Sequence, residues 1–471
     1  MSTIKSEPIK AAFTKLVRQK PMNKQPALFS YVEKVDWIDP LLFYKNGASV
    51  YKGERFFWKD RDGQVEMVGL GNIYTLRSEE GDEARYEEVE KKWNNMIKCA
   101  VVHNPYTALG TGPALFGGFS FDPNRPQAEE WAKFSSAFFY LPEYMLTVYE
   151  GNCYITINIL CRPEELHSLI DHLESRKDEV LTHTDTTALE LPASLLKKEE
   201  YHQAQWIKGV NEAVERMEAD TELKKVVLAR KIVASFDQAV SHDGVLERLI
   251  AQQPDSFIFS LEAMDSCFLG ASPERLVRKR GEKVLSTCLA GSIKRSKNPE
   301  EDEALGKELL NDEKNRKEHD YVVQMIKEEM EGLCKHVSIP SAPELMKVRD
   351  IQHLHTPVVG LTEAACSILQ FVEKLHPTPA LGGLPNDKAL PIIRQLEGMD
   401  RGLYGAPVGW MDSQGNGEFA VAIRSGLLEK EKAFLYAGCG IVADSDPDSE
   451  LAETQIKFRP MLRALGGSSD E

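Results

Sequence analysis

Short β-prone runs separated by turn residues recur through this 471-residue chain, and they constrain its fold more than any other feature. Such runs span Ala114–Phe121, Cys153–Leu160, Ala406–Met411, Phe419–Ile423 and Ala433–Ala437. The last three are bounded by Gly and Asn, which is typical of antiparallel hairpins. Helical segments interrupt the runs without strict βαβ alternation. We therefore predict an α+β fold with large antiparallel β-sheets flanked by helices.

Several further elements follow from hydrophobic spacing. Strands are predicted for Lys225–Arg230, Phe257–Leu261, Cys267–Leu269 and Lys283–Leu289. Helices are predicted for Asp82–Val101, for the apolar positions between Tyr201 and Met217, for a long charged segment from Pro299 to Cys334, and for a C-terminal segment that follows Asp446. In the last of these, Asp446 is the expected N-cap and Pro447 the expected first-turn residue.

A Thr-rich stretch, Thr182–Pro192, has few large apolar residues and is predicted to be a surface connector. It separates residues 1–190, which show few chemical markers, from residues 195–465, which carry most of them. We interpret residues 1–190 as a variable N-terminal part of the same fold and residues 466–471 as a disordered tail.

The net charge of the chain limits the kinds of molecule that it can bind. Lys and Arg number 57 and Asp and Glu number 73, so the formal net charge is −16. Such a chain repels nucleic acid and anionic membranes, and a small anionic substrate needs locally placed cations or a metal.

Hydropathy and cysteine spacing indicate the compartment. No apolar run approaches the roughly 20 residues of a membrane-spanning helix. The eight cysteines include no CxxC pair, which fits reduced thiols. We predict a cytosolic protein.

Carboxylates on two predicted helices are candidate metal ligands. Glu450, Glu453 and Lys457 share one face of the C-terminal helix, and Glu318 lies in the charged segment. Carboxylate oxygens suit Mg²⁺, which is usually held by one or two of them together with water and substrate oxygens. An ordinary solvated helix face with an i, i+4 Glu–Lys pair explains the same pattern, and sequence spacing leaves both interpretations open.

Two residues beside predicted strands are candidates for proton transfer. Lys225 opens an apolar strand, and Glu274 directly follows another in Gly270-Ala-Ser-Pro-Glu274. A lysine base must lose its proton near neutral pH, which requires its pKa to fall by roughly three units from about 10.4. A partly buried carboxyl can keep its proton and act as an acid. A lysine snorkelling at a strand end is the common alternative for Lys225.

Two turn-rich segments complete the candidates. His376–Gly383 is a loop on which the backbone can approach a ligand closely, or an ordinary structural turn. Gly438-Cys-Gly440 is a glycine pair without the GxGxxG pattern, so no dinucleotide site is predicted.

Taken in order, these segments resemble the chorismate-binding enzymes of the menaquinone, siderophore and tryptophan pathways. The resemblance covers residues 195–465 and is specific as an ordered combination, whereas the first 190 residues match loosely. The matching stretches are Lys225–Arg230, Gly270–Glu274, Leu289–Ser292, Glu318-His319, Gln352–Leu354, His376–Pro379, Ala422–Arg424, Gly440–Ser445 and Glu450–Thr454.

The resemblance implies the fold of anthranilate synthase component I and a deep site that binds chorismate with Mg²⁺. Lys225 would activate water for attack at ring carbon C2, and Glu274 would protonate the departing C4 hydroxyl. The other implied roles are metal binding by Glu318 and Glu453 with help from Glu450, binding of the enolpyruvyl carboxylate by Arg424 and Tyr404, support of the carboxylate and metal end by Lys457, and lining of the substrate pocket by His353, Ala380 and Gly438.

Within the family, the implied activity is that of an isochorismate synthase. Relatives that use ammonia tend to carry Gln at the place of Lys225, and the aminodeoxychorismate branch carries a nucleophilic Lys at the place of Ala290. Salicylate synthases, which also eliminate pyruvate, often have Thr at the place of Ala380, although they share Tyr404. The alternatives are therefore salicylate synthase, an isochorismate synthase of a catechol siderophore route, and a non-catalytic chorismate-binding subunit.

The long N-terminal half favours the menaquinone route. We expect a monomer or weak homodimer without a glutaminase subunit. Two departures from the family pattern are Cys288, where many relatives have Pro, and Pro460, which should kink or end the last helix early.

Overall fold

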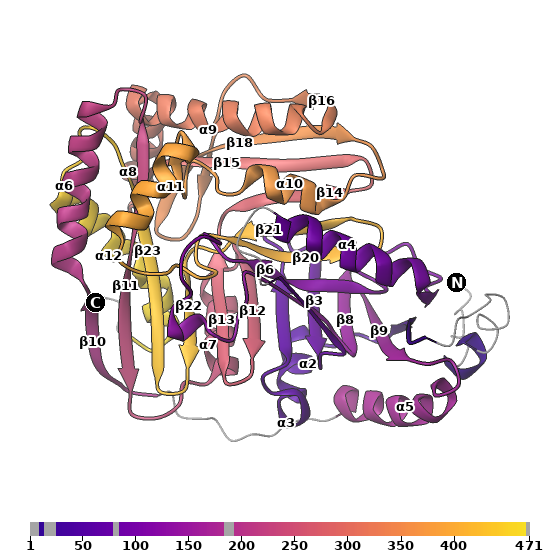
Figure 1. Ribbon diagram of the computed structural model, residues 1–471. Coiled ribbons are helices and arrows are strands. Elements are labelled where there is room, and N and C mark those ends of the chain that lie inside the picture. The colour runs from indigo at the N-terminus through magenta and orange to yellow at the C-terminus, as the bar shows by residue number, and fades with distance from the viewer. Residues whose placement is uncertain (1–8, 14–24, 79–83, 183–192, 468–471) are drawn as a thin grey trace.

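The computed structural model describes residues 9–13, 25–78, 84–182 and 193–467, and it confirms the α+β fold (Figure 1). Among these residues, one sheet has 13 strands and the other has 10. The pairing of β1 with β5 is parallel, and the other described pairings are antiparallel. Helices flank the two sheets rather than alternate with single strands.

The strands of each sheet come from both ends of the chain. The 13-stranded sheet has, in spatial order, β10 (Leu195–Tyr201), β11 (Lys225–Phe236), β23 (Lys432–Ile441), β22 (Ser425–Glu429), β13 (Ser266–Ser272), β12 (Phe257–Ala263), β2 (Arg55–Lys59), β3 (Val65–Leu70), β8 (Tyr144–Tyr149), β9 (Asn152–Cys161), β1 (Ala27–Val35) and β5 (Val101–His103), with β19 (Gly383–Leu384) beside β11. The 10-stranded sheet has β16 (Cys334–Ser338), β18 (Ile351–Thr362), β15 (Lys283–Lys294), β14 (Arg275–Arg280), β21 (Gly417–Val421), β20 (Pro407–Asp412), β6 (Ala114–Phe119), β7 (Ala137–Leu141) and β4 (Tyr74–Ser78), with β17 (Glu344–Lys347) beside β18.

The helices lie outside these sheets (Figure 1). Their bounds are α2 (Pro40–Asn46), α3 (Ala48–Tyr51), α4 (Ala84–Cys99), a 3₁₀ turn (Glu129–Trp131), α5 (Leu166–Thr182), α6 (Gln203–Ala219), α7 (His242–Gln252), α8 (Pro299–Asn311), α9 (Glu313–Glu331), α10 (Ile368–Leu375), α11 (Asn386–Leu396) and α12 (Pro447–Ala464). No helix among the described residues is long and apolar enough to cross a membrane.

The predicted strands all coincide with observed ones, and the helix predicted over Asp82–Val101 is α4. The predicted connector lies outside the described residues from position 183 to 192, as do residues 468–471 of the predicted tail. All eight cysteines are free thiols, as the absence of paired spacing indicated.

One helix prediction is wrong, and of the two effects predicted for Pro460, a kink or an early end, the early end is not found. The segment Pro299–Cys334 forms two helices because Asp312 is extended, with ψ 115°, and caps the second one by accepting a hydrogen bond from the backbone N–H of Asn315. In the C-terminal helix Asp446 is the N-cap as predicted, but Pro460 does not end the helix, which continues to Ala464. The missing N–H of a proline removes a single helical hydrogen bond, and buried residues on both sides of Pro460 hold the last turn in place.

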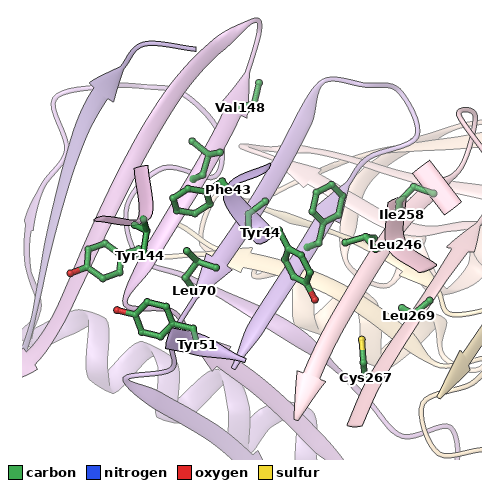
Figure 2. Packing of buried hydrophobic residues seen from close by; sticks show 14 of the residues in the cluster. Phe43, Tyr44, Tyr51, Leu70, Tyr144, Val148, Leu246, Ile258, Cys267 and Leu269 are labelled. Atoms are coloured by element: carbon green, nitrogen blue, oxygen red, sulfur yellow. The ribbon is translucent and has the colours of Figure 1, made fainter. Parts of the chain in front are cut away.

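The N-terminal and C-terminal parts of the chain share one core. β2 pairs with β12 and β6 pairs with β20, so each sheet joins strands from the two sides of residue 190. Figure 2 shows part of a buried cluster that mixes side chains from both parts, among them Phe43, Tyr44, Leu70, Leu246, Ile258 and Leu269.

Candidate active site

A cavity lies where the two sheets meet. β11 and β23 of the 13-stranded sheet line one part of it, β15 and β18 of the 10-stranded sheet line another, and α9 and α12 contribute charged side chains. The lining residues are Lys225, Val227, Pro273, Glu274, Leu289, Ala290, Gly291, Ser292, Glu318, His353, Ala380, Leu381, Tyr404, Ile423, Arg424, Tyr436, Ala437, Gly438, Cys439, Gly440, Glu453 and Lys457.

The cavity brings together most of the site residues suggested by the sequence. The ones that line it are Lys225, Glu274, Glu318, His353, Ala380, Tyr404, Arg424, Gly438, Glu453 and Lys457. Glu450 does not belong to the lining in the described structure, and its carboxylate accepts a hydrogen bond of 2.8 Å from Ser445 Oγ. Glu450, one turn before Glu453, therefore does not itself line the cavity.

Lys225 is a buried lysine whose side chain pairs with Glu318. Its residue is 7% exposed, and its Nζ lies 2.5 Å from Glu318 Oε1. The neighbouring strand makes room for this side chain, because a Cβ atom at Gly440 would lie 2.3 Å from Lys225 Cε. Any larger residue at position 440 would push the ammonium out of its present place.

Glu274 is a carboxyl group buried beside cations. It is 5% exposed and follows β13, and its backbone carbonyl accepts a hydrogen bond from Val421 N–H. Burial raises its pKa to about 7, although Lys225, Lys457 and Arg424 each lower it. A carboxyl whose pKa is raised this far can keep its proton near neutral pH, as a general acid requires.

Arg424 supplies positive charge to the cavity. Among the described residues, no carboxylate oxygen lies within 4.0 Å of its guanidinium, and burial lowers its pKa. Its backbone has a φ of 53°, a left-handed conformation that costs roughly 1–2 kcal/mol for a residue with a Cβ. Tyr404 stacks on Tyr436 with ring centroids 5.4 Å apart, so its ring is held beside this cation. Arg424 can therefore bind an anionic group in the cavity.

The carboxylates of Glu318 and Glu453 reach the cavity from different helices, and each is already paired with an ammonium. Lys457 Nζ lies 2.6 Å from Glu453 Oε1 and donates to the Gly438 carbonyl at 2.8 Å. Burial raises the pKa of Glu453, but Lys457, Arg424 and Lys225 outweigh it and lower the pKa overall. Two carboxylate groups beside a cavity fit a hard divalent cation such as Mg²⁺.

Some lining residues received no role from the sequence. The ring of Tyr436 stacks against the ring of Tyr404, and its hydroxyl accepts a hydrogen bond of 3.1 Å from Trp131 Nε1. Ser292 stands opposite His353 across the β15–β18 pair. Tyr436 lies in a predicted strand and Ser292 lies in one of the stretches that match the family. Which of these side chains face the cavity depends on the register between neighbouring strands, which the sequence alone does not give.

One protein family and two named relatives match this chain over nearly its whole length. The family described as "Chorismate binding enzyme" matches residues 12–466. Isochorismate synthase MenF of Bacillus subtilis is 43% identical, with 96% of this chain and 96% of that protein covered. The salicylate biosynthesis isochorismate synthase of Pseudomonas aeruginosa is 34% identical, with 98% and 96% covered.

A solved structure of MenF, the menaquinone-specific isochorismate synthase from Escherichia coli, has the same fold, with a TM-score of 0.78, 23% identity, and 98% of this chain and 100% of that chain covered. The family match spans nearly the whole chain, and two relatives above 30% identity cover almost its full length. This chain is therefore a member of the chorismate-binding enzymes.

Proposed function

We propose that this protein is an isochorismate synthase, which converts chorismate into isochorismate. One observation carries the proposal: a buried lysine, Lys225, and a carboxyl with a pKa of about 7, Glu274, line one cavity that also presents Arg424, whose guanidinium has no carboxylate partner among the described residues. A base, an acid and an anion-binding group are what water addition to a dianionic ring requires. The names of the two full-length relatives support this activity.

The proposed reaction exchanges one hydroxyl for another. Lys225 takes a proton from water as the oxygen bonds to ring carbon C2, the double bonds shift, and the C4–O bond breaks. Glu274 gives its proton to the departing hydroxide, so one water enters, one leaves, and the net change is an isomerisation. An ammonium held by a carboxylate is not a base, so turnover requires that Glu318 separate from Lys225.

The substrate's two carboxylates need positive charge inside an acidic protein. Arg424 and Tyr404 would bind the enolpyruvyl carboxylate, and Lys457 would support the ring carboxylate. Mg²⁺ would be held by Glu318 and Glu453, with Glu450 acting through water, and when bound it supplies positive charge for the ring carboxylate. His353, Ala380 and Gly438 would complete the walls of the pocket.

The resemblance to the family implies that water is the nucleophile. Ammonia-using relatives tend to carry Gln at the place of Lys225, and the aminodeoxychorismate branch carries a nucleophilic Lys at the place of Ala290; both residues line the cavity here. Salicylate synthases often have Thr at the place of Ala380, so the alanine at this position favours stopping at isochorismate. We further propose a cytosolic enzyme of the menaquinone route that acts as a monomer or weak homodimer without a glutaminase subunit.

Product analysis tests the activity. Purified protein is incubated with chorismate, with and without Mg²⁺, and the products are separated chromatographically. We expect isochorismate, formed only when Mg²⁺ is present. Salicylate with pyruvate would instead identify a salicylate synthase, and an absence of turnover under both conditions would favour a binding subunit.

Magnesium binding is tested on the two carboxylates separately. Glu318→Gln and Glu453→Gln should each weaken Mg²⁺ binding at least tenfold, because each removes one anionic ligand. Calorimetric titration with Mg²⁺ alone measures this without turnover. Glu313→Gln, an exposed change on the same helix α9, is the control. Unchanged Mg²⁺ affinity in both site variants would remove these residues from the metal site.

A further inference from the structure

A second cavity, called the outer cavity below, adjoins the candidate active site. It has a volume of about 520 Å³ and lies between the start of β11, the first turns of α9 and the loop that follows β23. A cavity of this size can hold a small organic molecule. Lys225 and Glu318 line both cavities, so the two cavities meet at this ion pair. The other wall residues that matter here are Lys224, Lys314, Lys317, Tyr321, Ala443 and Asp444.

The shared ion pair lies on the solvent side of the active-site cavity. The Glu318 side chain is 30% exposed, whereas Glu274 and Tyr404, in the same lining, are buried. The outer cavity continues from Glu318 to open solvent, since Tyr321 in its wall is 52% exposed. A molecule that moves from solvent to Glu274 through the outer cavity therefore passes between Lys225 and Glu318.

The outer cavity is rich in lysine, although the chain as a whole is acidic. Its walls carry four lysines and three acidic residues, whereas the formal net charge of the chain is −16. Lys314 Nζ lies 3.0 Å from an Asp444 carboxylate oxygen, and Lys224 donates a hydrogen bond to the uncharged Thr221 carbonyl. In the described part of the chain, no carboxylate oxygen lies within 4.0 Å of the Lys224 or Lys317 ammonium. These two charges can therefore attract an anion.

We infer that the outer cavity is the route by which the anionic substrate enters the active site and the product leaves it. Lys224 and Lys317 attract the substrate carboxylates from solution, and the Lys225–Glu318 pair stands at the inner end of the route. The separation of Glu318 from Lys225 that turnover requires also opens this passage. One movement thus admits the substrate and frees the base. The inference rests on the proposed function, because it takes a dianion as the substrate.

A bulky side chain placed in the outer cavity tests the route. Chorismate is mixed in a stopped-flow instrument with magnesium-loaded Glu274→Gln, which should bind it with little conversion, and intrinsic fluorescence follows association and dissociation. In this background Ala443→Trp narrows the outer cavity from an exposed position in its wall. A narrowed route slows entry and exit alike, so we expect both rate constants to fall at least fivefold while Kd changes less than twofold.

The matched control is Ala304→Trp, an exposed change on α8 outside the linings of both cavities, which should leave both rate constants unchanged. An unchanged association rate constant in Ala443→Trp would overturn the proposal. An equal effect of the two tryptophans would overturn it as well.

The role of the lysines is tested by ionic strength. Lys317→Glu should lower the association rate constant about threefold near 0.01 M salt, and the difference should vanish near 1 M, because the screening length falls from about 30 Å to about 3 Å. Lys52→Glu makes the same change of charge just after α3, far from α9 in Figure 1, and should have less than half of this effect. Equal effects in the two variants, or no effect in Lys317→Glu, would overturn the role of Lys317.

Failure of the inference is distinguishable from failure of the function. If the wild-type protein forms isochorismate but Ala443→Trp leaves association unchanged, only the route is wrong. If the wild-type protein neither binds nor converts chorismate, the function itself is wrong.

Discussion

Two glutamic acids of the same cavity respond to their surroundings in opposite directions. Burial raises the pKa of both, but in Glu453 the neighbouring cations outweigh burial, whereas in Glu274 burial prevails. The difference suits their proposed roles, because a metal ligand must be ionised and a general acid must keep its proton. The carboxyl group is thus proposed to act as a metal ligand at Glu453 and as a general acid at Glu274 in the same cavity.

The pKa of Glu274 predicts a cost in stability above neutral pH. Its folded pKa of about 7 exceeds the usual 4.5, so its favourable contribution is present below pH 4.5 and is lost as pH rises through 7. Glu274→Gln stays neutral and should be more stable than the wild type at pH 8, by at most about 3 kcal/mol, and equal to it at pH 4.5. Urea unfolding at both pH values measures this.

Glu282→Gln, an exposed change in the β14–β15 turn, is the control for this comparison and should be neutral at both pH values. Equal stability of the wild type and Glu274→Gln at pH 8 would show that the carboxyl is not held in its neutral form.

The same residue predicts the pH dependence of turnover. Glu274 must be protonated to act as an acid, so kcat should fall as pH rises through about 7. Steady-state rates between pH 6 and 9 provide the measurement.

Lys225→Ala and Glu274→Gln should each lower kcat by about 10²–10⁴-fold while the far-ultraviolet circular dichroism stays unchanged. Near-normal rates in either variant would remove that residue from the mechanism.

Residue types and order predicted most of the cavity wall, but not all of it. Lys225 opens a predicted strand and Glu274 directly follows another, so their positions at strand ends followed from the sequence. Tyr436 and Gly440 did not receive a role, because their importance depends on which side chain of a neighbouring strand they meet. Cross-strand register is a tertiary property that one sequence does not display.

At the scale of elements, a single aspartate separates the two helices of the charged segment. Asp312 is the C-cap of α8 and the N-cap of α9, the helix that carries Glu318. The charged composition of Pro299–Cys334 predicted one continuous helix, because most charged residues are good helix formers. Among so many acidic residues, the one aspartate that caps a helix could not be recognised. The hairpin strands were easier to predict, because glycine and asparagine mark their ends.

Removal of this cap should weaken α9. Asp312→Ala deletes the hydrogen bond to Asn315 N–H and should destabilise the protein by about 1 kcal/mol. Equilibrium urea unfolding measures the loss. Lys317→Ala, an exposed change on the same helix, should alter stability by less than about 0.5 kcal/mol. If both variants behave alike, the cap does not determine the helix boundary.

At the scale of the whole molecule, a buried ionic network joins the two parts of the chain. Arg55 on β2 binds the Glu262 carboxylate on β12 through Nε at 2.9 Å and Nη2 at 2.7 Å, and His242 Nδ1 lies 3.0 Å from the same carboxylate. His242, Glu262 and Cys267 are close enough to share a metal ion. The guanidinium already supplies the positive charge there, so we assign the cluster a structural role.

Breaking this network should destabilise the entire protein. Glu262→Gln leaves the buried Arg55 without its main counter-ion and should cost about 3–5 kcal/mol. Burial raises the pKa of Glu262, but His242 and Arg55 lower it to about 2, so the stabilisation exists above pH 4.5 and is lost as pH falls toward 2. Thermal unfolding from pH 3 to 7 should show a flatter curve for Glu262→Gln than for the wild type.

Glu247→Gln, at an exposed ion pair with Lys45, is the matched control and should change stability by less than about 1 kcal/mol. A wild-type pH dependence in Glu262→Gln would contradict the role assigned to the buried carboxylate.

The pairing of β2 with β12 has a consequence for the support of the candidate site. Main-chain hydrogen bonds join β2 to β12, and β12 pairs in turn with β13, the strand that precedes Glu274. Removal of β2 would expose the long unpaired edge of β12, and such edges promote aggregation.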